Sequence, residues 1–467
     1  MKMWSGRFRE PLDRRFEQWQ RSFPFDQKLL LQELAASRAH ANALRAAGVL
    51  TQEEHALVLT GLDRLKTKSK EEPDFFDDPE AEDVHHFVEK RLVALIGETG
   101  KKLHSGRSRN EQIATDLRLS VRDAVDELER LLLEFTETFL KRAEQEKSSV
   151  MPAYTHLQRA EPVLVAHWLL AYFEMFVRDL ERLRDCRKRL NQCPLGSGAI
   201  AGAPLPLDRE LVAQKLGFDR PTANSMDATS DRDFAIEFVN VVTLLGVHLS
   251  RWAEELILFA TQEYGFIQLP EPYSTGSSAM PQKQNPDSLE LIRAKAARLI
   301  GCQTTLLTTM KGLPLAYNKD MQETQEPLLD AAATALASVE IANGFMQAVV
   351  FNRKKMRAAC ETGFMNALAA ATYLVQRGVP FREAHEIVAH AVQLCVVKKC
   401  ELQDLPLKEL REFSPAFGSD IHEQLQLEAV IQCHAVQGGT AAGHVQQALK
   451  TAREKLAALA EAHVTHA

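Results

Sequence analysis

A run of apolar residues at helical spacing, sustained for about eight turns, is the feature that most constrains the fold of this chain. Its members follow Asn110 at intervals of three and four: Leu117, Val121, Val125, Leu128, Leu132, Phe135 and Phe139. Such a helix is longer than those of most globular domains and needs partners of similar length to cover its apolar face. The pattern therefore predicts a bundle of long helices.

Four further segments carry comparable patterns, at about 162–191, 230–261, 288–310 and 327–350. Shorter helices are expected before them at 26–47, 51–68 and 83–96, and after them at 365–377, 382–398, 407–412 and from 441. No convincing strand pattern is present, so we expect an almost all-α chain. The change in helix length indicates three helical domains, at 1–109, 110–351 and 352–467, around a central five-helix bundle.

Composition restricts the class of protein. Of the 467 residues, 45% are hydrophobic and 25% charged, which is typical of soluble globular proteins. A net charge of −7 gives no reason to expect nucleic acid, and no apolar stretch predicts a membrane span. Seven scattered cysteines without a CxxC pair favour reduced thiols. We expect a cytoplasmic protein with no nucleic-acid or membrane partner.

The breaks between the long helices hold the residues suited to chemistry. In the loop 274–287, Ser277 and Ser278 offer hydroxyls, while Lys283 and Asn285 offer a cation and an amide donor. Such groups stabilise negative charge that develops in a transition state. The alternative is an ordinary surface loop that caps the next helix.

A second break, residues 105–112, crowds donors just before the longest helix. Ser108, Arg109 and Asn110 lie there, and the helix N-terminus adds a partial positive charge to these donors. This arrangement predicts a site for one or two carboxylates. A capped helix start with solvated arginines is the other interpretation.

The third break contains His156, next to Thr155 and between Pro152 and Pro162. A histidine acting as an acid here needs a carboxylate partner to raise its pKa, and Glu290, just inside the helix after the loop 274–287, is a candidate. A lone histidine is more often a structural group.

Other breaks carry weaker signals. Tyr317 and Gln322 lie in the stretch 311–325, which either contacts ligand or is a solvated loop. The glycine-rich stretch 195–204 lacks the Gly-Lys-Ser/Thr of a phosphate loop and favours a close-packed turn. The stretch 224–233 resembles a capped helix entry, with Ser230 and Asp233 as the capping pair. Asp83, His85 and His86 lack the partners of a metal site.

Three of these stretches resemble a known superfamily. Gly276-Ser-Ser-Ala-Met-Pro-Gln-Lys-Gln-Asn285 resembles the signature loop of the fumarase/aspartase superfamily. Ser105-Gly-Arg-Ser-Arg-Asn-Glu-Gln112 and Tyr154-Thr-His-Leu-Gln158 resemble its other active-site segments in the argininosuccinate lyase and δ-crystallin branch. The likeness runs from Trp4-Ser-Gly-Arg-Phe8, through Gly312-Leu-Pro-Leu-Ala-Tyr-Asn-Lys-Asp320, to Gly378-Val-Pro-Phe-Arg-Glu-Ala-His385.

This resemblance implies an assembly and a reaction. The fold would form a homotetramer whose central bundles make a twenty-helix core, with each active site built from three subunits. The reaction would be the reversible cleavage of argininosuccinate to arginine and fumarate through a stabilised carbanion, in arginine biosynthesis, without cofactor or metal.

The resemblance also implies roles for single residues. Ser277 would be the base, Lys283 and Asn285 would hold the aci-carboxylate, and His156 paired with Glu290 would be the acid at the leaving nitrogen. Substrate-binding positions would be Ser108, Asn110 and Thr155, with Arg109 nearby, Tyr317 and Gln322 at the arginine end, and Ser22 as another contact. Because serine is a poor base, its alkoxide needs stabilisation by the loop, so loop closure is expected in the mechanism.

One departure bears on the substrate. Most relatives read Gln-Glu-Asp-Lys-Glu where this chain reads Gln322-Glu-Thr-Gln-Glu326, so Gln325 replaces a lysine that contacts the amino-acid end of the substrate. Loss of that cation would cost about 1–3 kcal/mol of binding. Glu111 and Gln284 are smaller departures. Two alternatives follow: a lyase acting on another N-substituted aspartate, or a non-catalytic structural protein like the inactive δ-crystallins.

Overall fold

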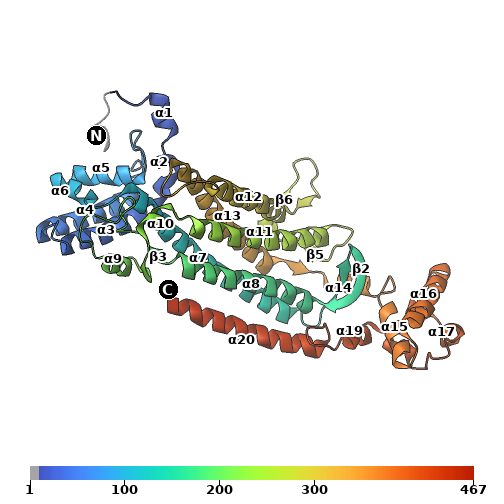
Figure 1. Cartoon of the computed structure of the whole chain (residues 1–467). Helices are drawn as coiled ribbons and strands as arrows, with labels where there is room; N and C mark the ends of the chain where they lie inside the picture. Colours follow the sequence, from blue (N-terminus) through green and yellow to red (C-terminus); the bar gives the residue numbers. More distant parts are fainter. Residues whose placement is uncertain (1–9, 467) are drawn as a thin grey trace. The chain divides into compact units, whose positions relative to one another are not determined.

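The computed structural model of the chain describes residues 10–466, and side-chain burial as far as residue 461 (Figure 1). The stretch Trp4–Phe8 of the resemblance lies outside the described residues. Helices dominate the described chain, as predicted. Five long helices form its central region: α7 (Arg109–Gln145), α8 (Val165–Leu190), α11 (Asp233–Ala260), α12 (Asp287–Met310) and α13 (Gln325–Ala348).

Contacts divide the chain into two compact units. The first holds the chain up to Leu128 with Glu181–Leu244 and Ala297–Leu336, and the second holds Glu129–Leu180, Leu245–Ala296 and the chain from Ala337 onward. Each unit therefore contains a segment of every long helix. The division into domains at 1–109, 110–351 and 352–467 is a different partition and stays a prediction.

Within the described residues, the first unit contains eight short helices, and some of them start at a side-chain cap. They are α1 (Arg14–Trp19), α2 (Phe23–Asp26), α3 (Leu30–Ala46), α4 (Gln52–Glu71), α5 (Val84–Ile96), α6 (Glu98–Lys101), α9 (Arg209–Lys215) and α10 (Ser225–Ser230). Thr51 and Glu54 form a capping box at α4, and Asp83 caps α5. Ser230, predicted as a cap, instead ends α10 and donates to the Met226 carbonyl, while Asp231 accepts from the backbone N–H of Asp233.

Aromatic side chains fill the long-helix core of the second unit. Phe135 of α7 packs against Phe176 of α8 and Trp252 of α11, with ring centroids 4.8 and 5.8 Å apart. Trp252 in turn meets Phe345 of α13 at 5.9 Å. All four rings are fully buried. The predicted apolar periodicity of α7 therefore faces a shared core of four helices.

The remaining helices belong to the second unit. They are α14 (Arg353–Cys360), α15 (Ala367–Gln376), α16 (Phe381–Lys398), α17 (Leu407–Phe413), α18 (Ile421–Gln424), α19 (Leu427–Cys433) and α20 (Ala442–His466). Leu374, Val388 and Ile421 belong to a separate hydrophobic cluster under α15 to α18. This cluster explains why the helices shorten after residue 351: each buries a small face against its neighbours.

The expectation of no convincing strand is wrong, because the described chain contains four two-stranded sheets, and its longest strands form one hairpin. Strands β1 (Val150–Thr155) and β2 (Gln158–Leu164) form an antiparallel hairpin immediately before α8, which begins at Val165 rather than near residue 162. Pro152 and Pro162 lie opposite each other in this hairpin. Both prolines exclude a helix interior, and that restriction explains the extended backbone here.

Helix α11 is long and apolar enough to cross a membrane when judged by length and composition alone. Within the described chain, 61% of its most apolar window is buried by the protein's own side chains. That burial is typical of a core helix.

The aromatic core gives a stability prediction. Phe135→Ala should lower the free energy of unfolding by about 3–5 kcal/mol, because it removes a fully buried ring and leaves a cavity. Urea unfolding followed by circular dichroism measures the change. Phe381→Ala, which removes a ring that is 53% exposed, is the control and should change stability little. Equal effects of the two substitutions would contradict the assignment of the core.

Candidate active site

The segment before α7 is a reciprocal helix cap in the first unit. The Ser108 hydroxyl accepts from the Asn110 backbone N–H at 3.3 Å, and the Glu111 carboxylate accepts from the Ser108 N–H at 2.9 Å. Glu111 is fully buried, and its second carboxylate oxygen has no hydrogen-bond partner among the described residues. Burial raises the pKa of Glu111, although the nearby backbone N–H groups of Ser108, Gly198 and Gly196 favour its ionised form. The cap thus lies close to the glycine-rich stretch, a break that is far away in sequence.

The glycine-rich stretch is the close-packed turn that the sequence favours. Gly198 has φ +62°, and a Cβ there would lie 2.7 Å from the Gly202 carbonyl oxygen. Gly106 has φ +69°, and a Cβ on it would lie 2.9 Å from a Leu205 side-chain carbon. Only glycine fits both the conformation and the space at these positions. Leu205, directly after this turn, therefore packs closely against the 105–112 segment.

The two arginines of this segment have different surroundings. Arg109 is partly exposed, with its Nε 3.0 Å from Asp83 Oδ2, and it donates to the Gln112 side-chain oxygen at 3.1 Å. Arg107 is buried and donates to the Ser37 hydroxyl at 2.9 Å. Burial alone would raise the pKa of Asp83, but Arg109, His85 and the His86 backbone N–H together outweigh burial, so the pKa is lowered. Arg109 is therefore the member of the pair that can meet a substrate.

Tyr317 lies in the electrostatic range of this group. Burial raises its pKa, and Arg232, Asp83 and Arg109 are the nearest charges that act on it. Arg232 is only 1% exposed and donates through one nitrogen to the Asp231 carbonyl, while its Nε and second terminal nitrogen have no partner among the described residues. A buried guanidinium with free N–H groups beside a phenol is a site for an anion.

Arg232 is the residue that sequence reasoning missed. It lies in the stretch 224–233, where the pattern of Asn, Ser and Asp predicts only helix capping. The available signal is the arginine itself, placed between Asp231 and Asp233 at the start of a strongly apolar helix. Its burial could not be foreseen from this spacing.

Other predicted residues of the first unit lie at the entry to α2. The Gln322 side chain donates to the Gln20 carbonyl at 3.0 Å, and the Ser22 backbone N–H donates to the Glu82 carbonyl at 3.0 Å. Glu82 directly precedes Asp83 in the chain. Gln325 is the first residue of α13 and is 3% exposed, so the departure from the family pattern concerns an inward-facing side chain.

In the second unit, the loop 274–287 is a hairpin that projects before α12 (Figure 1). Strand β6 (Thr275–Gly276) pairs with β7 (Gln284–Asn285) at its base. At the far side, the Ser277 hydroxyl oxygen accepts from the backbone N–H groups of Ala279 at 3.3 Å and Met280 at 3.1 Å. Two N–H donors at one hydroxyl oxygen favour negative charge on that oxygen.

The other candidates of this loop have different surroundings. Lys283 is exposed, and the Asn285 side chain donates to the Thr275 hydroxyl at 3.5 Å. The Thr275 hydroxyl also donates to Asp287, the first residue of α12. The base of the hairpin is therefore bonded to the helix, whereas the Lys283 side chain is exposed to solvent.

His156 occupies the turn of the β1–β2 hairpin. Thr155 pairs with Gln158 across the turn, and both His156 (φ +54°) and Leu157 (φ +57°) adopt the left-handed conformation. Two successive residues of this kind form the tight turn preferred by antiparallel hairpins, here without glycine and hence under strain. In the part of the chain that is described, no hydrogen bond or ion pair joins His156 to Glu290, and both are exposed. Their pairing stays a prediction.

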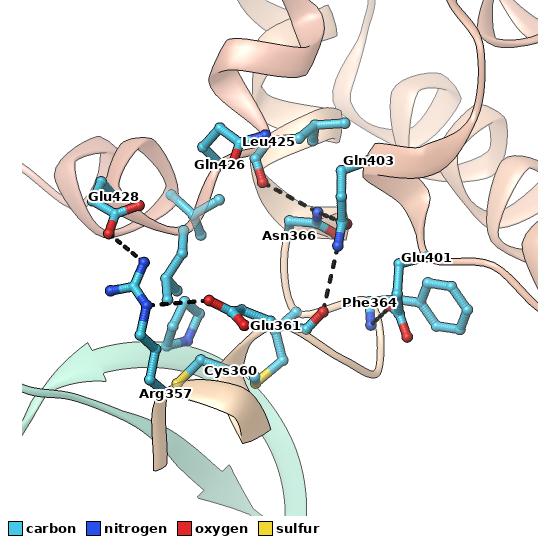
Figure 2. Close-up of a pocket in the computed structure, with 14 residues that line it drawn as sticks. Arg357, Cys360, Glu361, Phe364, Asn366, Glu401, Gln403, Leu425, Gln426 and Glu428 are labelled. Carbon is cyan, nitrogen blue, oxygen red and sulfur yellow. Dashed lines mark hydrogen bonds and ion pairs between the residues drawn. The ribbon is translucent and has the colours of Figure 1, made fainter. Parts of the chain in front are cut away.

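A separate polar cavity of about 230 Å³ lies in the second unit (Figure 2). Arg357 pairs there with Glu428 at 2.6 Å and with Glu361 at 3.2 Å, and the Glu401 carboxylate accepts from the backbone N–H groups of Gly363 and Phe364. None of the predicted site residues lines this cavity.

Comparison with known proteins decides the family. Residues 6–301 match the family described as Lyase, and residues 364–432 match the argininosuccinate lyase C-terminal family. An argininosuccinate lyase of Koribacter versatilis is 59% identical over 461 residues, which is 99% of both chains. The chain belongs to the argininosuccinate lyase family. It is accordingly a lyase, and its substrate is a small molecule.

Further relatives support the argininosuccinate lyase family and its fold. An argininosuccinate lyase of Acidobacterium capsulatum is 57% identical and covers 99% of this chain and 96% of its own. The crystal structure of EDDS lyase in complex with formate is similar with a TM-score of 0.85 at 27% identity, covering 96% of this chain and 91% of that one. The 3-carboxy-cis,cis-muconate lactonizing enzyme of Pseudomonas putida, 21% identical with a TM-score of 0.75 over 95% of this chain and 100% of that one, shares the fold.

The surroundings of Ser22 give a prediction about pH. Asp26, whose carboxylate interacts with the Ser22 hydroxyl and accepts from the Val84 N–H, has a pKa raised from 3.8 to about 6, by burial first and by Asp83 second. Its protonated form favours the folded state below the unfolded pKa, and this contribution is lost as pH rises through about 6.

Asp26→Asn replaces the titrating carboxyl group and therefore removes this loss of stability. The stability of the variant relative to the natural chain should rise between about pH 4 and pH 6 and then level off, by roughly 3 kcal/mol for two pKa units. Urea unfolding across this range measures it. The exposed Asp77→Asn should follow the natural chain at every pH; a variant with Asn at position 26 that also does so would disprove the raised pKa.

Proposed function

We propose that this chain cleaves argininosuccinate reversibly into arginine and fumarate, in the direction of arginine biosynthesis, and that Ser277 is the base. One observation carries the assignment of the base: the Ser277 hydroxyl oxygen accepts two backbone N–H groups. These donors stabilise an alkoxide and so offset the weak basicity of a serine hydroxyl. Family membership and the high identity to argininosuccinate lyases support the substrate.

The reaction starts with proton removal from the carbon next to a carboxylate of the succinate half. The electron pair left on that carbon delocalises into the carboxylate, which becomes a doubly charged aci-carboxylate. Lys283 and Asn285 supply a cation and an amide donor for this charge. Both belong to the same hairpin as Ser277, so movement of the hairpin would bring the base and the stabilising groups to the substrate together.

The carbanion then expels the nitrogen as the carbon–nitrogen bond breaks, and the leaving nitrogen needs a proton. His156 is the proposed donor and Glu290 the carboxylate that keeps it protonated. A strained turn that holds His156 at its tip supports the role, because strained backbone is retained where a side chain must be presented in one direction. Because His156 and Glu290 are both exposed and not in contact, the pair would form between subunits.

Substrate binding is assigned to the polar groups around α7 and α13. Arg109, Ser108 and Asn110, with Thr155, would hold carboxylates of the succinate half, and Tyr317, Gln322 and Ser22 would meet the arginine half. The partly exposed Arg109 guanidinium and the helix N-terminus behind it favour an anion. Arg232 joins this group because two of its nitrogens have no partner among the described residues and because it interacts electrostatically with Tyr317.

A homotetramer with sites shared between subunits is the proposed assembly. Ile300 and Leu307 of α12 are 46% and 48% exposed and lie two turns apart on one helix face. Leu157 beside His156 is 66% exposed. Apolar side chains exposed in this pattern on a single chain are typical of faces covered by other copies. All seven cysteines are free thiols, which supports a cytoplasmic location.

The rival function is a lyase for another N-substituted aspartate. It is favoured by Gln325 and by the structural likeness to EDDS lyase, a differently named lyase of the same fold. A non-catalytic structural role, as in the inactive δ-crystallins, is the alternative outside enzymes. Purified protein mixed with argininosuccinate and followed by fumarate absorbance separates the three: argininosuccinate should be the preferred substrate, and no fumarate release would overturn the proposal.

Ser277→Ala should lower kcat by at least about a thousandfold, because the base is removed while binding groups remain. Circular dichroism and the elution volume should stay unchanged. Ser278→Ala is the matched control, since Ser278 is the exposed neighbour in the same hairpin and should keep nearly full activity. Normal turnover by the Ser277 variant would move the base to another residue.

Gln325→Lys should lower KM for argininosuccinate roughly 5- to 100-fold with little change in kcat, since it restores a cation worth about 1–3 kcal/mol at a carboxylate contact. Steady-state kinetics measure this. Gln325→Met, which is similar in length and uncharged, is the control and should not lower KM. A raised KM in the lysine variant would mean that position 325 does not face the substrate.

A further inference from the structure

Three buried acid–base groups of the first unit meet behind the segment 105–110. His85 of α5 has its Nδ1 2.8 Å from a Glu33 oxygen and 3.5 Å from an Asp116 oxygen. Ligand atoms of all three side chains lie within 4.8 Å of one another, and each residue is at most 3% exposed. None of the three has a role in the proposed reaction.

Glu33 is supplied with donors from several elements. The Ser37 hydroxyl donates to it at 2.6 Å, the Gln112 amide lies 3.3 Å from both of its oxygens, and the Arg107 guanidinium is 3.9 Å away. Burial would raise the pKa of Glu33, but His85 and Arg107 lower it overall. Glu33 is therefore the ionised member of the cluster.

Asp116 differs from Glu33 because it lacks hydrogen-bond donors. It is completely buried, and neither of its oxygens has a hydrogen-bond partner among the described residues. An ionised carboxylate without donors is one of the most costly groups to bury. Burial and the charge of Glu33 both raise the pKa of Asp116. If Asp116 is protonated, its own O–H group supplies the hydrogen-bond donor that the cluster lacks.

A bound metal ion is the competing explanation for the same three side chains. A histidine with two carboxylates resembles a zinc ligand set. However, Glu33 already receives Ser37, Gln112 and His85 as donors, and the cationic Arg107 shares the space. These contacts leave Glu33 little capacity to bind a cation. The number of hydrogen-bond donors around Glu33 therefore favours a proton on Asp116 over a bound metal ion.

The cluster is connected directly to the proposed carboxylate-binding segment. Gln112 donates to Glu33 and accepts from Arg109, and Arg107 contacts both Ser37 and Glu33. The charged and titratable groups that act on Asp116 are Asp26 of α2, Glu33 of α3, His85 of α5 and Arg107, which lies just before α7.

We propose that Asp116 is a positioning residue: as a neutral carboxylic acid it donates its O–H to Glu33, and the completed network holds Gln112, Arg107 and, through Gln112, the substrate-facing Arg109. This inference rests on the proposed function, in which the 105–110 segment binds substrate. The role differs from that of Arg109, because Asp116 acts only through Glu33.

Asp116→Asn and Asp116→Ala separate this role from others. The amide of asparagine is a neutral donor and should keep KM and kcat within about twofold, whereas alanine removes the donor and should raise KM roughly tenfold or more with a smaller effect on kcat. Asp123→Asn, on the exposed face of α7, is the control. Both variants are assayed well below their unfolding temperatures, so that lost stability alone leaves the KM of the folded protein unchanged. An alanine variant with normal KM, or an asparagine variant as impaired as alanine, would overturn the proposal.

Infrared spectroscopy tests the proton without any need for activity. The spectrum of the natural protein minus that of Asp116→Asn at pH 7 should contain the carbonyl band of a protonated carboxylic acid. Absence of the band would falsify the neutral state. If the natural protein releases no fumarate while the band is present, the proposed function fails and the protonation of Asp116 stands.

Metal analysis decides the competing explanation. Mass spectrometry of the purified protein should find no stoichiometric metal, and added Zn²⁺ should not change its unfolding temperature through position 116. A stoichiometric ion that is lost in Asp116→Asn would replace the proton with a metal site.

Discussion

The long apolar face of α7 is the constraint on which the rest of the structure depends. A stripe that includes Phe135 can be buried only by helices of comparable length, and α8, α11 and α13 contribute Phe176, Trp252 and Phe345 for this purpose. A tightly packed interior of this kind has no room for substrate. Reactive groups must therefore lie where helices begin and end, and the segments around Ser108, His156, Ser277 and Tyr317 are all of this type.

Helix ends bring a second requirement, because their backbone groups need partners. Ser108 and Glu111 meet part of that requirement for α7. The same segment must also present Arg109 outward while Arg107 is buried. The network of Glu33, Gln112 and Asp116 reconciles these demands: it compensates the buried guanidinium and fixes the backbone from which Arg109 extends.

Sequence patterns predicted the features that depend on local spacing. The five long helices and the close-packed glycine turn follow from periodicity and residue type. The β1–β2 hairpin was missed because its prolines interrupt alternation, and the burial of Arg232 was missed because it depends on tertiary contacts. The roles assigned to Ser277, Lys283 and His156 came from resemblance, and in the proposed homotetramer these residues would meet through contacts between subunits.

In the β1–β2 hairpin, the strand register determines which residues occupy the turn. Thr155 opposes Gln158, so His156 and Leu157 form the turn, while the opposed prolines at 152 and 162 have no N–H groups with which to hold the alignment. A slip by one residue would exchange the faces of every side chain in the strands and move another residue into the place of His156. The position of the His156 imidazole, the proposed proton donor, is thus set by backbone pairing several residues away.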